Sequence, residues 1–405
     1  KALYKITHKI KKGIKGTLLP CSMFEDMGFQ YMGPVDGHDV KTLTRLLDYA
    51  SKVNGPVLLH VKTIKGKGYP PAEKNPDAFH GIGPFHKETG ALITSKTAET
   101  FSSRFGHDLT ELAKQDQRIC AITAAMTSGT GLAAFSKAFP DRFFDVGIAE
   151  EHAVTMAAGM AKQGLIPVFA VYSTFFQRSY DMLMHDIAID HIHAVFGIDR
   201  AGLVGDDGET HHGLFDLGFL QTIPGITVLC PASLDELSDM LERAVHRMDG
   251  PVAVRYPRGG ENFYSENHSD APDYLLKDGT DLTIVTFGTL TGNCLAVADR
   301  LQQEGISAQV LKLNQLVPLP TELALDCLSK TKRLLVAEEC ITQGSPGQGI
   351  LAAAAQSGLT LEGVAVCSCG KDFVPHGTIP QLRSLCGLDI DSLYKKAKEV
   401  MEHGR

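Results

Sequence analysis

Asp145-Val-Gly-Ile-Ala-Glu-Glu-His-Ala-Val-Thr-Met-Ala-Ala-Gly159 is the stretch of sequence that decides the fold. The residues just before it are apolar and favour a β-strand, whereas Ala153, Ala157 and Ala161 recur at the spacing of one helix face. The stretch therefore predicts a strand that passes directly into a helix. In open α/β sheets ligands bind at such junctions, because strand ends and helix N-termini converge on a crevice.

Two neighbouring carboxylates, Glu150 and Glu151, lie at this predicted junction. Successive helix positions point about 100° apart, so at most one of the two side chains can face inward. Acidic residues are also common in the first turn of a helix, where the helix dipole stabilises them. Taken alone, the stretch favours this simpler interpretation, and the rest of the sequence must show whether Glu150 does more.

Length and composition indicate an ordinary globular protein of two or three domains. The chain has 405 residues, of which 43% are hydrophobic and 21% charged, so each domain can form its own core. The formal net charge of −8 argues against nucleic acid and anionic membranes as partners. No apolar run reaches 18 residues and no signal peptide is recognisable, so we expect a cytoplasmic protein, in a bacterial cytosol or in a plastid. The nine cysteines contain no CxxC pair and are expected to be reduced thiols.

The first segment, residues 1–92, is interpreted as the C-terminal remnant of a doubly wound domain. The chain begins with Lys1 rather than Met, and we expect it to be the later part of a longer polypeptide. A basic, weakly helical opening is expected over residues 1–15, a turn-rich loop over residues 31–38, and a helix over residues 39–52 before a buried strand.

Strand and helix patterns alternate over residues 93–270 and again over residues 278–405. This alternation predicts an α/β protein with tandem doubly wound parallel-sheet domains, each sheet covered by helices on both faces. A strand over residues 168–175 is expected to run into a helix, and residues 261–280 are expected to form a polar connector. The third segment carries no recognisable site and is interpreted as structural and dimer-forming.

Polar and aromatic residues follow several predicted strands of the second segment. These are Glu150, the run from Tyr172 through Phe175 to Arg178, then Arg200, the loop with Asp207 and His211, and Arg258. In a parallel sheet all of them lie along one edge. Each has an ordinary explanation as a surface ion pair, a core ring or a loop residue, but their joint occurrence predicts a catalytic crevice. The three arginines favour a phosphorylated or carboxylated substrate, Asp207 with His211 forms a titratable pair, and the aromatic rings can stack on a flat heterocycle.

A second candidate anion site is Lys65-Gly-Lys-Gly-Tyr69. Glycine lets backbone N–H groups approach an anion closely, although the spacing differs from that of a P-loop.

Seven motifs together resemble the 1-deoxy-D-xylulose-5-phosphate synthase family of transketolase-like thiamine diphosphate enzymes. They span residues 31–39, 65–69, 144–152, 172–178, 199–202, 207–211 and 255–259. The resemblance implies a transketolase-like fold and a transferase that joins pyruvate to glyceraldehyde 3-phosphate with loss of carbon dioxide. The product, 1-deoxy-D-xylulose 5-phosphate, feeds the synthesis of isoprenoids, thiamine and pyridoxal. A homodimer and the cofactors thiamine diphosphate and Mg²⁺ are implied as well.

The resemblance also implies roles for individual residues. Glu150 corresponds to the carboxylate that bonds the aminopyrimidine ring of thiamine and promotes its imino tautomer. The other matches are Ile148, Tyr172 and Phe175 around that ring, Tyr69 and Lys65 as further cofactor contacts, Arg200 and Arg258 on the acceptor phosphate, Arg178, Asp207, His211 and Tyr172 near the substrates, and His80 on a closing loop.

One family motif is absent from the sequence. The Gly-Asp-Gly…Asn motif that binds magnesium and the diphosphate does not occur, so the metal ligands are expected in a missing N-terminal part. The chain alone is then expected to bind the cofactor weakly and not to turn over. Three alternatives stay open: a split transketolase, the β subunit of a 2-oxo acid dehydrogenase, and a non-catalytic dimerising partner.

Overall fold

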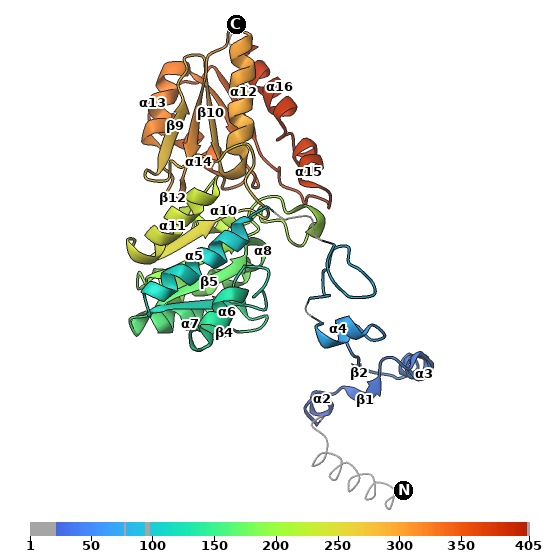
Figure 1. The fold of residues 1–405 in the computed structure, drawn as a ribbon. Coiled ribbons are helices and arrows are strands. Elements are labelled where there is room, and N and C mark those ends of the chain that lie inside the picture. Colours follow the sequence, from blue (N-terminus) through green and yellow to red (C-terminus); the bar gives the residue numbers. More distant parts are fainter. Residues whose placement is uncertain (1–21, 77, 94–97, 403–405) are drawn as a thin grey trace, which may run out of the picture. The chain divides into compact units, whose positions relative to one another are not determined.

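The computed structural model describes residues 22–76, 78–93 and 98–402, so the opening predicted for residues 1–15 lies outside the described part. Contacts divide the chain into two compact units, residues 1–97 and 98–405, and each unit is described by itself. Figure 1 shows the elements of both units.

The first unit contains a small parallel sheet. Its elements are α2 (Ser22–Asp26), β1 (Gln30–Asp36), α3 (Val40–Ala50), β2 (Val57–Lys62) and α4 (Pro70–Lys74). The prediction of a loop over residues 31–38 was wrong, because β1 pairs with β2 along most of this run. The ladder accommodates Gly33 and Pro34 by shifting its register between Met32 and Val35, so these two residues bulge rather than end the strand.

The second unit begins with a seven-stranded sheet in the order β12-β7-β8-β6-β5-β3-β4. Its strands are β3 (Ile119–Thr123), β4 (Phe143–Asp145), β5 (Ile166–Tyr172), β6 (Ala194–Asp199), β7 (Thr227–Leu229), β8 (Pro251–Arg255) and β12 (Gln315–Val317). The associated helices are α5 (Phe101–Gln115), α6 (Ala133–Ala138), α7 (Glu150–Lys162), α8 (Ser173–Phe176), α9 (Tyr180–Met182), α10 (Asp216–Leu220) and α11 (Leu234–His246).

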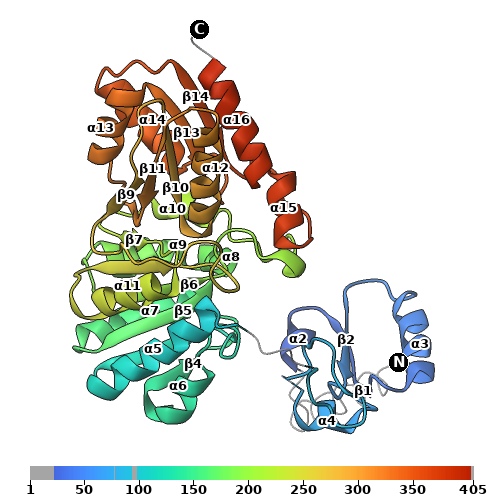
Figure 2. The same cartoon turned by 45° about the horizontal axis from the view of Figure 1, so that its top comes forward.

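A five-stranded sheet in the order β14-β13-β10-β11-β9 completes the second unit. Its strands are β9 (Asp273–Lys277), β10 (Leu282–Phe287), β11 (Ala308–Leu313), β13 (Arg333–Ala337) and β14 (Gly363–Cys367). Its helices are α12 (Thr291–Gln303), α13 (Glu322–Thr331), α14 (Pro346–Gln356), α15 (Ile379–Leu385) and α16 (Ile390–Glu402). Figure 2 shows α12 and α16 together on one side of this sheet and α13 and α14 on the other.

The predicted α/β class with tandem, mainly parallel sheets is confirmed, but two edge strands are antiparallel. Strand β9 pairs antiparallel with β11, and β12 pairs antiparallel with β7. The connector predicted over residues 261–280 therefore contains a strand. A short, half-buried edge strand shows little of the periodicity that marks a central one.

Strand β5 ends earlier than predicted, at Tyr172 rather than Phe175. Tyr172 pairs with Asp199, which is the last residue of the neighbouring strand β6. Beyond this point the backbone has no strand to pair with on that side, and α8 starts at Ser173. The aromatic residues after β5 therefore lie on a helical turn at the sheet edge.

One hydrophobic core and one buried ion pair connect the two sheets of the second unit. Phe169 and Phe196 of the larger sheet belong to the same buried cluster as Val285 and Leu311 of the smaller one. Lys312 Nζ on β11 lies 2.7 Å from Glu236 Oε1 on α11, and both side chains are fully buried. A charge pair in this setting holds the two sheets in one arrangement, because separating the partners would leave each charge buried alone.

A second buried carboxylate, Glu338, follows β13 and should make stability depend on pH. Its Oε2 accepts a hydrogen bond from the Gly347 amide at 3.0 Å, and burial raises the pKa of this carboxyl to about 7. The folded protein therefore holds a proton here between the usual pKa of 4.5 and about 7. Stability from this group is fully present below pH 4.5 and is lost as the pH rises through 7.

We expect Glu338→Gln to remove this loss, since glutamine carries no proton to release. Thermal midpoints measured between pH 5 and 8 should show the unmodified protein losing stability relative to the variant, on the order of 3 kcal/mol. Glu322→Gln, at an exposed position, is the control and should follow the unmodified protein. Parallel pH curves for all three proteins would contradict the prediction.

Candidate functional site

The strand order of the larger sheet brings the predicted site residues of the second unit to one edge. Strands β8, β6, β5, β3 and β4 are consecutive neighbours and mutually parallel. Arg258, Arg200 and Glu150 follow the carboxyl ends of β8, β6 and β4, and Tyr172 is the last residue of β5. These predicted residues therefore lie at adjacent strand ends.

Glu150 is the buried carboxylate of this edge. It is the first residue of α7 and is 1% exposed, whereas its neighbour Glu151 is exposed. Its Oε1 lies 2.5 Å from Arg178 Nη1, while its Oε2 is buried without a hydrogen-bond partner among the described residues. The prediction that only one of the two carboxylates faces inward is confirmed, and that carboxylate keeps one oxygen available.

Aromatic rings and Arg178 line the space next to this carboxylate. The rings of Tyr172 and Phe175 stack with centroids 6.0 Å apart, and the ring of His211 meets Phe175 edge-on at 5.3 Å. The guanidinium of Arg178 lies 4.9 Å from the centre of the Phe175 ring. Glu150, Arg178, Phe175, Tyr172 and His211 therefore form one chain of contacts.

Arg200 is largely occupied by protein groups. Its guanidinium carbon lies 3.9 Å above the Tyr172 ring, and its Nη1 donates to the Gly129 carbonyl at 2.6 Å and lies 3.0 Å from Asp199 Oδ2. The side chain is 13% exposed, and its backbone has a φ of +59°, which is uncommon for a residue other than glycine. Burial raises the pKa of the Tyr172 hydroxyl. Arg200 thus fixes the Tyr172 ring and presents little of its charge to solvent.

Arg258 is the more accessible arginine. Its Nη1 lies 2.9 Å from Asp207 Oδ2 and 3.0 Å from the Val204 carbonyl, and 40% of its side chain is exposed. It borders a cavity of about 260 Å³ that is also lined by Val204, Gly205, Gly259, Thr378 and Ile379. Asp207 lies on the same loop as His211, whose ring centroid is 6.3 Å from that of Tyr172, so this cavity adjoins the aromatic rings.

Two residues that the sequence analysis did not single out shape this edge. Asp145 accepts hydrogen bonds from the Ala125 and Gly147 amides at 2.8 and 3.0 Å, and so ties the loop of small residues over 124–131 to β4. A Cβ at Gly129 would lie 1.8 Å from the Tyr172 hydroxyl oxygen. The run of small residues was visible in the sequence, but its contact with Tyr172 was not.

Ile148, predicted to line the cofactor, is 78% exposed.

The remaining predicted residues lie in the first unit. Tyr69 donates to the Lys87 carbonyl at 2.8 Å and packs edge-on against Phe79, whereas Lys65 and His80 are exposed. Within the first unit, Tyr69 thus contacts residues of its own loop. Within the described ranges, no group of three or more His, Cys, Asp or Glu side chains is arranged to hold a metal ion.

Comparison with known proteins gives three family matches in chain order. Residues 1–63 match the 1-deoxy-D-xylulose-5-phosphate synthase model, residues 99–260 the transketolase pyrimidine-binding domain, and residues 274–393 the transketolase C-terminal domain. The chain is 44% identical over 402 residues to the 1-deoxy-D-xylulose-5-phosphate synthase of Desulfitobacterium hafniense, covering 98% of this chain and 63% of the relative. The corresponding protein of Heliobacterium modesticaldum is 44% identical over 411 residues, covering 99% of this chain and 62% of the relative.

Along nearly its whole length the chain is thus similar to 1-deoxy-D-xylulose-5-phosphate synthases. It spans less than two thirds of the length of these curated relatives. Among solved structures, a split-gene transketolase described as an inactive β4 tetramer matches with a TM-score of 0.67 and 26% identity, covering 76% of this chain and all of the other. None of the helices in the described part of the chain is long and apolar enough to cross a membrane.

The tight approach between Gly129 and Tyr172 can be tested by adding one methyl group. We expect Gly129→Ala to lower the free energy of unfolding by about 1–3 kcal/mol, because the new Cβ would force the Tyr172 ring from its place beneath Arg200. Thermal or denaturant unfolding measures this change. Gly159→Ala is the control: it is an exposed position of α7 with open space around it, and helix propensity should make it neutral or stabilising by up to about 1 kcal/mol. Equal effects of the two substitutions would contradict the prediction.

Proposed function

We propose that this chain provides the aminopyrimidine-binding half of an enzyme that uses thiamine diphosphate to condense pyruvate with D-glyceraldehyde 3-phosphate. The products are 1-deoxy-D-xylulose 5-phosphate and carbon dioxide, a transketolase-class transfer. The observation that carries the proposal is the buried Glu150 carboxylate with one oxygen unpartnered beside stacked aromatic rings. The 44% identity to synthases of this name over nearly the whole chain supports the same assignment.

The residues present fit the aminopyrimidine ring of the cofactor. A carboxylate oxygen accepts a hydrogen bond from a protonated ring nitrogen, and the unpartnered Oε2 of Glu150 is available for this bond. Tyr172 and Phe175 supply flat faces against which a heterocycle can lie. When bound, thiamine diphosphate supplies the electron sink that decarboxylation of pyruvate requires. The protein groups orient the ring, hold the proton at its nitrogen and exclude water from the reacting atoms.

Arg258 supports a phosphorylated acceptor. Its half-exposed guanidinium borders a cavity of about 260 Å³, and a guanidinium matches the geometry of a phosphate group. Asp207 holds Arg258 in place, and His211 with Thr210 provides polar groups for hydroxyls on the same loop. These features favour a sugar phosphate over lipoamide, the acceptor expected for a 2-oxo acid dehydrogenase. A split transketolase is the second candidate, favoured by the 26% identity to a split-gene transketolase.

The diphosphate and Mg²⁺ belong to the other half of the proposed site. Lys65 and Tyr69 of the first unit would contribute to it, and His80 would close over the substrates. The remaining ligands would come from the part of the relatives that this chain does not match. We also propose a homodimer and a location in a bacterial cytosol or a plastid.

An assay of carbon dioxide release from pyruvate, in an enzyme that carries both halves of the site, tests the proposed function. Release should depend on glyceraldehyde 3-phosphate, and Glu150→Gln should reduce it by about 100-fold or more, because an amide cannot hold the ring proton in the same way. Glu151→Gln is the matched control, since that neighbouring carboxylate is exposed and should be dispensable. Full activity of Glu150→Gln would indicate a non-catalytic partner, and release without the phosphorylated aldehyde would indicate another thiamine enzyme.

A separate prediction concerns the 405-residue chain by itself. We expect it to bind thiamine diphosphate weakly and to show no turnover, because its sequence lacks the Gly-Asp-Gly…Asn motif that binds magnesium and the diphosphate in the family it resembles. Isothermal titration with the cofactor and Mg²⁺ should give tight binding only after the diphosphate-binding half of a relative is added. Turnover by the chain alone would contradict this prediction.

A further inference from the structure

The loop that carries Asp207 and His211 is held against the C-terminal domain by a buried histidine, His212. This side chain is 3% exposed. Its Nδ1 accepts a hydrogen bond from the Val204 amide at 3.1 Å, and its Nε2 lies 3.1 Å from the carbonyl oxygen of Pro375, 163 residues further along the chain. Because Nδ1 is an acceptor, the ring proton is on Nε2, which therefore donates to Pro375. One imidazole thus bonds the start of the loop and the C-terminal domain at the same time.

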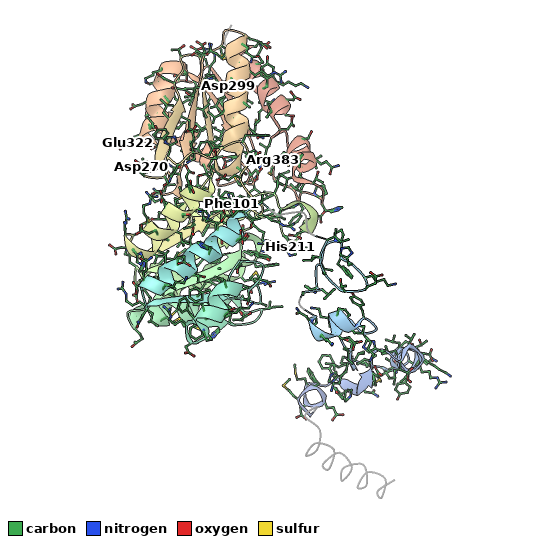
Figure 3. All side chains as sticks on the ribbon, in the orientation of Figure 1. Phe101, His211, Asp270, Asp299, Glu322 and Arg383 are labelled. Atoms are coloured by element: carbon green, nitrogen blue, oxygen red, sulfur yellow. The ribbon has the colours of Figure 1, made fainter. Side chains whose placement is uncertain are left out.

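The backbone of the loop fits closely against the same segment of the C-terminal domain. A Cβ at Gly208, where φ is +74°, would lie 3.1 Å from His376 Cβ, so glycine permits both the turn and the approach. Next to this contact, Thr378 and Ile379 line the cavity beside Arg258. Figure 3 labels His211 on the loop and Arg383 on α15, and both lie in the region where the two domains meet. The wall of the cavity opposite the loop therefore comes from the C-terminal domain.

We infer that His212 is a positioning residue that couples the C-terminal domain to the acceptor pocket. It fixes residues 204–211 against the segment Pro375–Ile379, so that Arg258, Asp207 and the C-terminal wall together shape the space for the phosphate end of the acceptor. This inference rests on the proposed function for the identity of the acceptor, but the coupling between loop and domain does not. The C-terminal domain then contributes directly to acceptor recognition and is more than a dimer-forming scaffold.

Three substitutions separate the two hydrogen bonds of His212. His212→Phe keeps a ring of similar size and removes both bonds, while His212→Asn can keep an acceptor for the Val204 amide and loses the bond to Pro375. His212→Gln keeps a longer amide that can donate to Pro375. The control is His193→Phe, because both ring nitrogens of His193 also lie within hydrogen-bond distance of backbone atoms, the carbonyl oxygens of Gly250 and Val245, but His193 lies just before β6 at the opposite edge of the sheet.

Steady-state kinetics of the complete enzyme gives the first readout. His212→Asn should raise KM for glyceraldehyde 3-phosphate by about tenfold, the effect of one lost hydrogen bond, and His212→Phe, which loses both bonds, by at least as much, with little change in KM for pyruvate in either variant. His212→Gln should recover most of the loss, and His193→Phe should leave both KM values unchanged. Wild-type KM values in His212→Asn, or an equal rise for both substrates, would overturn the coupling.

Amide hydrogen exchange gives a readout that does not need turnover. His212→Asn should accelerate exchange at residues 376–379 while the Val204 amide stays protected, whereas His212→Phe should expose both. Unchanged exchange at 376–379 in both variants would also overturn the inference. If the enzyme released carbon dioxide without the phosphorylated aldehyde, the proposed function would fail, yet the exchange result would still decide whether His212 joins the loop to the C-terminal domain.

Discussion

The burial of the Glu150 carboxylate is the constraint on which the site depends. Removing a carboxylate from water costs several kcal/mol unless charges and donors around it compensate. Here the compensation is partial: Arg178 meets one oxygen, and the start of α7 places the carboxylate at the positive end of the helix dipole. The second oxygen has no partner among the described residues, so a donor brought by a ligand would gain a strong hydrogen bond without displacing an existing one.

The other groups at this edge are arranged around that carboxylate. Arg178 can reach Glu150 because its guanidinium also lies against Phe175, and Phe175 stacks on Tyr172. Tyr172 is in turn covered by Arg200, whose unusual backbone conformation and bond to the Gly129 carbonyl leave it little freedom. Such a site is preorganised, because each of these side chains is held in place by contacts with its neighbours. The strain at Arg200 is acceptable because the buried Asp199 and the loop at Gly129 both hold its side chain.

Sequence periodicity predicted the individual strands and helices of this fold, whereas the contacts between residues far apart in the sequence are visible only in the structure. The alternation of strand and helix patterns predicted both sheets, and the sequence around Glu150 predicted the junction and that at most one of the two carboxylates could face inward. The antiparallel strands β9 and β12 could not be predicted, because an edge strand is defined by the partner it meets and not by its own pattern. The same holds for side-chain partners: Arg200 and the Gly129 carbonyl are 71 residues apart, and no local pattern connects them.

Few of the described side chains in the first unit are buried. Helix α3 is amphipathic, yet none of its residues is buried, and Val40 and Leu47 are 71% and 58% exposed. Two paired strands and short helices bury too little apolar surface to hold loop side chains rigidly. The side chains of Lys65 and His80 are exposed in this unit. Glu150 of the second unit, in contrast, is fixed by the core beneath α7.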